Sequence, residues 1–185
     1  MRTFIVHRWD GKPNSDWYPW LKKELEKKGF NVGVPKMPNT SAPQIDEWVS
    51  HLKKTVGKLD NDTCFIAHSI GCQTVMRYLE KENYNGKIGS VVFVAGWFNL
   101  DKLEGEDVKA IADPWINTPI EFSNVKPKIS KLTVILSDNE PYGFVKENAK
   151  MFKDKLGANV KILENKGHFT SDEGVTKLPE VLSEI

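Results

Sequence analysis

The sequence lacks the features that direct a protein to a membrane or to a nucleic acid. No apolar run approaches the roughly 20 residues that span a bilayer. The opening MRTFIVHRWD has only a short apolar stretch, interrupted by His7 and Arg8, so we expect no secretory or transit leader. With 26 Lys and Arg against 25 Asp and Glu, the formal net charge is only +1, which gives no general attraction for nucleic acid or anionic lipid. We therefore expect neither a nucleic acid nor a membrane as a partner.

Cysteine is also scarce. The only two, Cys64 and Cys72, fall on a predicted buried strand and on the helix after it. A stabilising disulfide is not expected there, and the pattern is typical of a reducing, cytoplasmic setting. No spacing of Cys and His resembles a zinc site, so we expect no metal and no organic cofactor.

Short apolar blocks are the main positive signal in the chain. Its 185 residues, 39% of them hydrophobic, suffice for one well-buried core, and we expect a single domain over residues 1–185. The blocks lack polar alternation, which is typical of strands covered on both faces, and amphipathic helical patterns separate them. The blocks are TFIV (3–6), NVGV (31–34), TCFIA (63–67), SVVFVAG (90–96), LTVILS (132–137) and NVKIL (159–163). This alternation predicts a doubly wound α/β fold, with a mostly parallel six-stranded sheet and helices on both faces.

Residues 97–128 break the alternation. More than 30 residues pass there without a clear strand, and they include three prolines and several aromatic residues. A connection of that length is usually functional when it is ordered, so one interpretation is a cap over a site at the carboxyl edge of the sheet. The alternative is one ordinary crossover helix with irregular loops.

The pentapeptide AHSIG (67–71) raises the question of function. Ser69 follows a predicted strand and precedes a predicted helix, and small residues, Ala67 and Gly71, lie two positions to either side. A nucleophile elbow requires small residues at those positions, because its tight turn brings the helix against the strand. The alternative is a serine that merely caps the helix.

The order of other polar residues favours the nucleophile. In α/β-hydrolases the serine is followed in the chain by an acid and then a histidine, each after a different strand. Here DNEPYG (138–143) and ENKGHF (164–169) follow the last two predicted strands, which supplies Asp138 or Glu140 and then His168. The other three histidines are weaker candidates for the triad histidine. His68 should point away from the Ser69 hydroxyl, His51 lies on a helix face, and His7 ends the first strand.

Several motifs in this order resemble a known family. They are VHRWDGKPNSDWYPWLKKEL at the start, MPN (37–39), DEW (46–48), AHSIGCQTVMRYLE, VVFVAG, PW (114–115), GHF, and EG and LP near the end. The whole chain is similar to the small α/β-hydrolases typified by retinoblastoma-binding protein 9 and its YdeN-type bacterial relatives. The resemblance implies a serine hydrolase fold with Ser69 and His168 in a catalytic triad.

The chain departs from the family pattern at two positions. Family members usually have Asp directly before the proline of the acid turn, where this chain has Glu140; register favours Glu140 as the acid, with Asp138 as the alternative. Superfamily members often have His-Gly after the first strand, where this chain has His7-Arg8. We expect the backbone N–H groups of Ile70 and Trp9 to stabilise an oxyanion, with the N–H of Arg8 as an alternative to that of Trp9. The Arg8 side chain could bind a substrate carboxylate, although an ion pair is the more common outcome.

These residues predict acyl transfer. Ser69 would attack a small-molecule ester, thioester or activated amide, and water would release the acyl-enzyme. Aromatic residues are expected to line the substrate pocket together with His7: Trp97, Phe98, Trp115, Tyr142 and Phe169. Two alternatives stay open, namely a binding protein with an unspecified protein partner and little or no turnover, and an acyltransferase.

Overall fold

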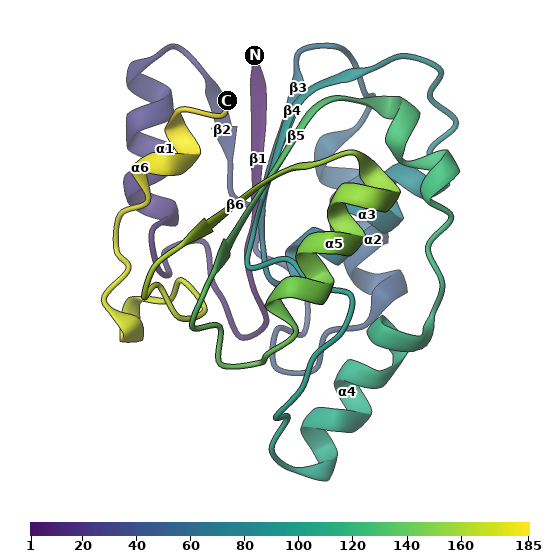
Figure 1. Ribbon diagram of the computed structural model, residues 1–185. Helices are drawn as coiled ribbons and strands as arrows, with labels where there is room; N and C mark the ends of the chain where they lie inside the picture. Colours follow the sequence, from purple (N-terminus) through teal and green to yellow (C-terminus); the bar gives the residue numbers. More distant parts are fainter.

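A computed structural model describes all residues, 1–185. It confirms the doubly wound α/β architecture, and the six strands are all parallel (Figure 1). The strands are β1 (Arg2–Val6), β2 (Asn31–Gly33), β3 (Thr63–His68), β4 (Ile88–Val94), β5 (Ile129–Ser137) and β6 (Asn159–Leu163). Each of the six predicted blocks overlaps one strand.

The strand order places two functional loops next to each other. The sheet runs β2-β1-β3-β4-β5-β6, so the chain reverses its direction of travel across the sheet between β2 and β3. β1 therefore pairs with β3, in a register that sets Val6 opposite Ala67. In open α/β sheets, ligands bind beyond the carboxyl ends of strands at such a switch point. The loop after β1 and the turn containing Ser69 lie together at that point.

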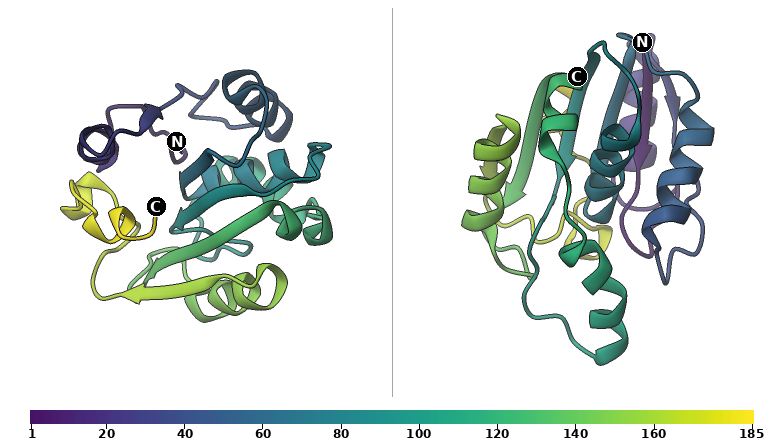
Figure 2. Two further views of the ribbon diagram at one scale, coloured as in Figure 1. Left: turned by 90° about the horizontal axis from the view of Figure 1, so that it is seen from above. Right: turned by 90° about the vertical axis from the view of Figure 1, so that its right-hand side faces the viewer.

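Helices cover both faces of the sheet, as Figure 2 shows. α1 (Tyr18–Lys27) and α6 (Pro179–Leu182) lie on one face, and α2 (Ile45–Val56), α3 (Ile70–Lys81) and α5 (Val145–Leu156) lie on the other. Two buried apolar clusters fill the spaces between helices and sheet, one on each face. None of the helices combines the length and the apolar character that crossing a membrane requires.

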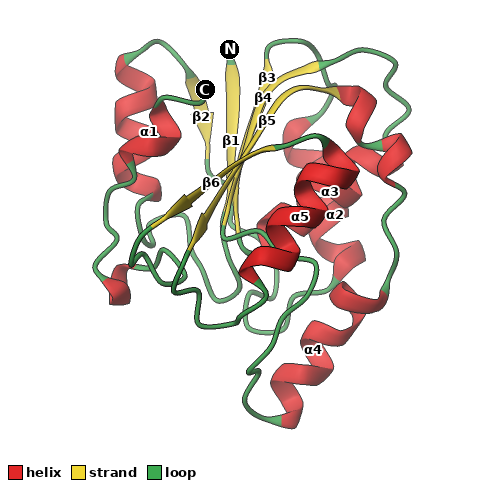
Figure 3. Cartoon of the chain, viewed as in Figure 1, coloured by secondary structure: helices red, strands yellow, loops and turns green.

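The long connection between β4 and β5 contains one regular helix. α4 (Glu106–Asn117) extends beyond the carboxyl end of the sheet (Figure 3), and two short 3₁₀ turns follow at Phe122–Asn124 and Lys126–Lys128. The indole N–H of Trp115 anchors the helix by donating to the Pro43 carbonyl at 3.0 Å. Residues 97–128 thus form a crossover with a projecting helix, and their role as a cap remains a prediction.

Gly71 allows α3 to approach β1 closely. A Cβ atom on Gly71 would lie 2.5 Å from the Val6 carbonyl oxygen and 2.9 Å from that of His7. Because both neighbours are backbone atoms, they cannot move aside as a side chain would. Gly71→Ala should therefore lower the free energy of unfolding by about 3 kcal/mol or more, measured by urea denaturation.

Gly29→Ala is the matched control for Gly71→Ala. Gly29 has a φ of +85° and no atom within 4 Å of a built Cβ, so only the conformational cost of about 1 kcal/mol applies. Equal losses in the two variants would contradict the steric role of Gly71.

Candidate active site

Ser69 lies on a strained turn between β3 and α3. Its φ of 56° and ψ of −122° are unusual for a residue with a side chain and cost free energy that the surrounding structure must supply. Its N–H donates to the Val94 carbonyl at 2.9 Å, which holds the turn against β4. The side chain does not cap the helix. The structure thus has the backbone geometry of a nucleophile elbow rather than that of an ordinary N-cap.

The Ser69 hydroxyl contacts Trp97 in this structure. The indole N–H of Trp97 donates to Ser69 Oγ at 3.3 Å, and both residues are buried. No hydrogen bond joins Ser69 to His168. Catalytic hydrogen bonds are often long or poorly aligned before substrate binds, so the absence of this bond is compatible with His168 acting as the base.

His168 is oriented by Glu140. The Nδ1 atom of His168 lies 2.8 Å from Glu140 Oε1, and both side chains are about nine-tenths buried. The Tyr142 ring meets the imidazole edge-on at a centroid distance of 5.0 Å. Asp138, the alternative acid, instead accepts the Asn165 N–H at 2.8 Å. The structure therefore brings Glu140 to His168 and uses Asp138 within the loop.

The expected oxyanion donors lie on adjacent loops. Ile70 is the first residue of α3, and the first N–H groups of a helix lack intrahelical acceptors. The Arg8 N–H already donates to the Tyr18 hydroxyl at 3.2 Å, whereas the Trp9 N–H donates to no group of the chain. Of the two alternatives on the first loop, Trp9 is the one whose N–H is available.

The Arg8 side chain is occupied by an ion pair. Its Nε donates to Asp16 Oδ2 at 2.8 Å, and a second nitrogen lies 3.4 Å from Oδ1. Burial alone would raise the pKa of the Asp16 carboxyl, but hydrogen bonds from Arg8 and from the Ser171 N–H lower that pKa below its ordinary value. Arg8 is therefore not available to a substrate carboxylate.

Of the six expected pocket residues, only two lie at the site. Trp97 lines a recess beside His168, and Tyr142 packs against the imidazole. The other four do not line this recess and are buried in the interior: His7, Phe98, Trp115 and Phe169. Helices and loops pack over the carboxyl ends of the strands, so these rings fill the core instead of facing substrate.

The recess beside His168 is small. It is lined by Gly96, Trp97, Leu100, Leu136 and His168, among others. Its volume of about 10 Å³ is room for roughly one water molecule. Any group larger than this would enter the recess only if Trp97 or its neighbours moved.

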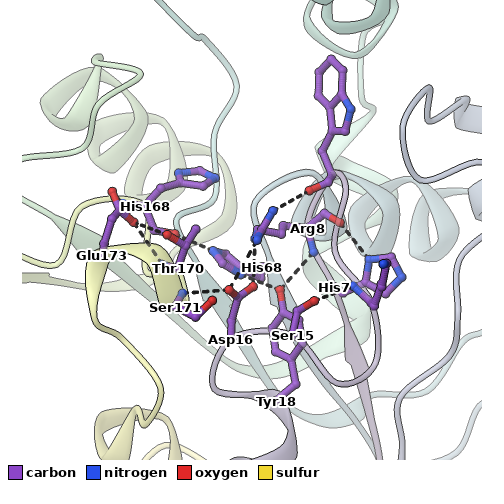
Figure 4. A network of polar contacts seen from close by, with 12 residues as sticks. His7, Arg8, Ser15, Asp16, Tyr18, His68, His168, Thr170, Ser171 and Glu173 are labelled. Carbon is purple, nitrogen blue, oxygen red and sulfur yellow. Dashed lines mark hydrogen bonds and ion pairs between the residues drawn. The ribbon is translucent and has the colours of Figure 1, made fainter.

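A buried hydrogen-bond network lies behind the site (Figure 4). The Tyr18 hydroxyl and His68 Nδ1 are 2.7 Å apart, and His68 Nε2 lies 2.7 Å from the His168 carbonyl oxygen. Glu173 accepts the His168 N–H at 2.8 Å. Neither ring nitrogen of His68 bonds to the Ser69 hydroxyl, whose partner is Trp97. Asp16, Tyr18 and Glu173 were not predicted from the sequence, although the capping-box pattern T-x-x-E at 170–173 signals Glu173.

Comparison with known proteins decides the family. Residues 3–185 match the family model described as serine hydrolase. The chain belongs to the serine hydrolase family. YdeN of Bacillus subtilis (strain 168) is 27% identical over 184 residues, which cover 97% of this chain and 92% of YdeN.

Solved structures agree on the fold. The crystal structure of the Bacillus subtilis ydeN gene product matches this serine hydrolase with a TM-score of 0.88 and 25% identity, covering 98% of this chain and 95% of that one. Est1E from Butyrivibrio proteoclasticus, in its ferulic acid complex, matches with a TM-score of 0.70 and 12% identity, covering 99% of this chain and 88% of that one. The resemblance to the YdeN-type family is confirmed, and at its low identity Est1E supports the α/β-hydrolase fold alone.

Proposed function

We propose that this serine hydrolase cleaves small carboxylic esters, thioesters or activated amides, with Ser69 as nucleophile, His168 as general base and Glu140 as the acid that orients the base. The observation that carries the proposal is the 2.8 Å contact between Glu140 and His168 Nδ1 at the sheet edge where Ser69 sits on its strained turn. A carboxylate on Nδ1 leaves Nε2 free to accept a proton and stabilises the imidazolium that then forms.

The proposed reaction has two halves. After Ser69 Oγ rotates away from Trp97, it attacks the substrate carbonyl carbon while its proton passes to His168 Nε2. The N–H groups of Ile70 and Trp9 stabilise the oxyanion. The carbon–oxygen bond to the leaving alcohol breaks, the alcohol takes the proton from His168, and an acyl-Ser69 ester remains. Water then attacks the acyl carbon while giving a proton to His168 Nε2; the bond to Ser69 Oγ breaks, Oγ takes that proton back from His168, and the carboxylic acid leaves.

Labelling with a fluorophosphonate tests the proposal directly. A single adduct, mapped by peptide mass spectrometry to the peptide containing Ser69, is the expected result, and excess small ester should slow its formation. Absence of an adduct under conditions that label another serine hydrolase would overturn the proposal and favour the binding-protein alternative. Capture of the acyl group by added alcohol in preference to water would instead indicate an acyltransferase.

The small recess predicts a preference for short acyl chains. We expect p-nitrophenyl acetate to be hydrolysed with a kcat/KM at least about 10-fold above that for the octanoate. Trp97→Ala should narrow that difference, because it removes the largest side chain lining the recess. Trp20→Ala, which alters α1 on the opposite face of the sheet, serves as control. An unchanged chain-length preference in Trp97→Ala would contradict the assignment of the recess to the acyl group.

A further inference from the structure

The inner side of the proposed site contains a histidine that the reaction does not use. His68 precedes the nucleophile, is fully buried, and packs among Trp17, Tyr18 and His168. Both of its ring nitrogens have hydrogen-bond partners in the protein (Figure 4). A buried imidazole with a hydrogen bond at each nitrogen, next to the proposed nucleophile, needs a physical explanation.

The partners of His68 determine its tautomer. A carbonyl oxygen only accepts hydrogen bonds, so the 2.7 Å contact with the His168 carbonyl requires a proton on His68 Nε2. Burial lowers the pKa of His68 to about 3, so the ring is neutral at ordinary pH and Nδ1 carries no proton. Nδ1 therefore accepts from the Tyr18 hydroxyl, which in turn accepts the Arg8 N–H.

The resulting chain of donors has one direction. It runs from the Arg8 N–H to the Tyr18 O–H, then through the His68 ring to the His168 carbonyl. It begins on the loop that holds the expected oxyanion donor Trp9 and ends on the backbone of the proposed base. The His68 ring and the Tyr18 hydroxyl thereby connect the loop after β1 to the loop that contains His168.

A second connection runs parallel to the first. Asp16 pairs with the Arg8 side chain and also accepts the Ser171 N–H at 2.9 Å. The Glu173 carboxylate holds the His168 N–H at 2.8 Å. The main chain of His168 is thus hydrogen-bonded at its carbonyl to His68 and at its N–H to Glu173.

We propose that His68 is a positioning residue, which holds the main chain of His168 at the distance from which its imidazole can reach Ser69. The proposal rests on the proposed function, because it assigns His168 the role of base. His68 itself transfers no proton to substrate. Its donor bond to the His168 carbonyl is the part that matters for the reaction, and the Tyr18 hydroxyl holds the ring from its other side by donating to Nδ1.

Two amide variants separate the two bonds of His68. In His68→Gln the amide nitrogen can occupy the place of Nε2 and keep the bond to His168, whereas in His68→Asn the shorter amide reaches only the place of Nδ1 and keeps the bond to Tyr18. We expect His68→Gln to remain within about 10-fold of the wild-type kcat. We expect His68→Asn to lose about 100-fold in kcat with little change in KM, the effect of a catalytic group displaced by about 1 Å.

Tyr18→Phe provides a second test in case the amide variants fold poorly. It removes the donor to His68 Nδ1, so the ring loses one of its two anchors and holds the His168 carbonyl less rigidly, and we expect a fall in kcat of about 10-fold. Tyr78→Phe is the matched control, because Tyr78 is equally buried and its hydroxyl has no hydrogen-bond partner. Equal losses in kcat for His68→Gln and His68→Asn, or for Tyr18→Phe and Tyr78→Phe, would overturn the proposal and leave His68 a packing residue.

Nitrogen-15 NMR of the imidazoles distinguishes failure of this proposal from failure of the proposed function. We expect His68 to show a protonated Nε2 and a bare Nδ1 between pH 5 and 8 in the wild type and also in Tyr18→Phe, because the His168 carbonyl still requires the proton on Nε2. A His68 ring that carries protons on both nitrogens in this range, or its single proton on Nδ1, would overturn the positioning role of His68. This result would hold whether or not the protein is an esterase. A wild type with the expected tautomer but no fluorophosphonate adduct would refute the proposed function alone.

Discussion

Replacing Ser69 by alanine should reduce ester turnover by at least about 10⁴-fold. Without Oγ there is no nucleophile to form the acyl-enzyme, and loss of the nucleophile in a triad removes nearly all of the rate that the triad provides. Because Ser69 forms only one side-chain hydrogen bond, at 3.3 Å to Trp97, the fold should survive. Substrate binding, measured by calorimetry, should then persist while turnover is lost.

Ser130→Ala is the matched control for Ser69→Ala. Ser130 lies on β5 near its amino end, where its hydroxyl donates to the Ile88 carbonyl at 2.6 Å, remote from the carboxyl edge. Its removal should leave kcat unchanged. If Ser69→Ala kept turnover within 10-fold of the wild type after separate purification, another group would have to be the nucleophile.

Replacing Glu140 by glutamine should lower kcat by about 10³- to 10⁴-fold. The new side chain would occupy the same space but would carry no negative charge to stabilise the imidazolium, and its amide could select the wrong tautomer of His168. Asp138→Asn should cost less than 10-fold, because Asp138 holds the Asn165 N–H and does not contact the imidazole. The measurement is kcat for both variants on one short ester.

Glu140→Asp refines this comparison. It keeps the charge but withdraws the carboxylate by about one bond length, roughly 1.5 Å, so its kcat should fall between those of the wild type and Glu140→Gln. A greater loss of kcat for Asp138→Asn than for Glu140→Gln would transfer the role of the acid to Asp138.

The sheet was predictable from the sequence because its strands are buried on both faces. Continuous apolar blocks such as TCFIA and LTVILS leave no polar alternation to confuse with an amphipathic helix. The order of Ser69, Glu140 and His168 was also predictable, since each follows a different strand and parallel strands end at one edge. The structure brings Glu140 into contact with His168, and their joint action with Ser69 stays a prediction.

The sequence could not predict which aromatic residues face the site. Phe169 and Tyr142 each lie in a loop near a proposed catalytic residue, yet Phe169 is fully buried and Tyr142 is 37% exposed. Whether such a ring is buried or exposed depends on how helices and loops pack over the strand ends. A local sequence pattern carries no information about that packing. The same holds for Asp16 and Ser171, which interact across 155 positions of the chain.

This long-range contact has a consequence for biosynthesis. The turn containing Ser69 and the helix α3 precede β4 in the chain, whereas the loop of His168 follows β6, the last strand. That loop is held by the side chains of Asp16, near the start of the chain, and of His68, next to Ser69. A nascent chain that ends after β5 contains Ser69 but not the proposed base His168. If the two residues act as proposed, the growing polypeptide stays unreactive until the His168 loop packs against the side chains of His68 and Asp16.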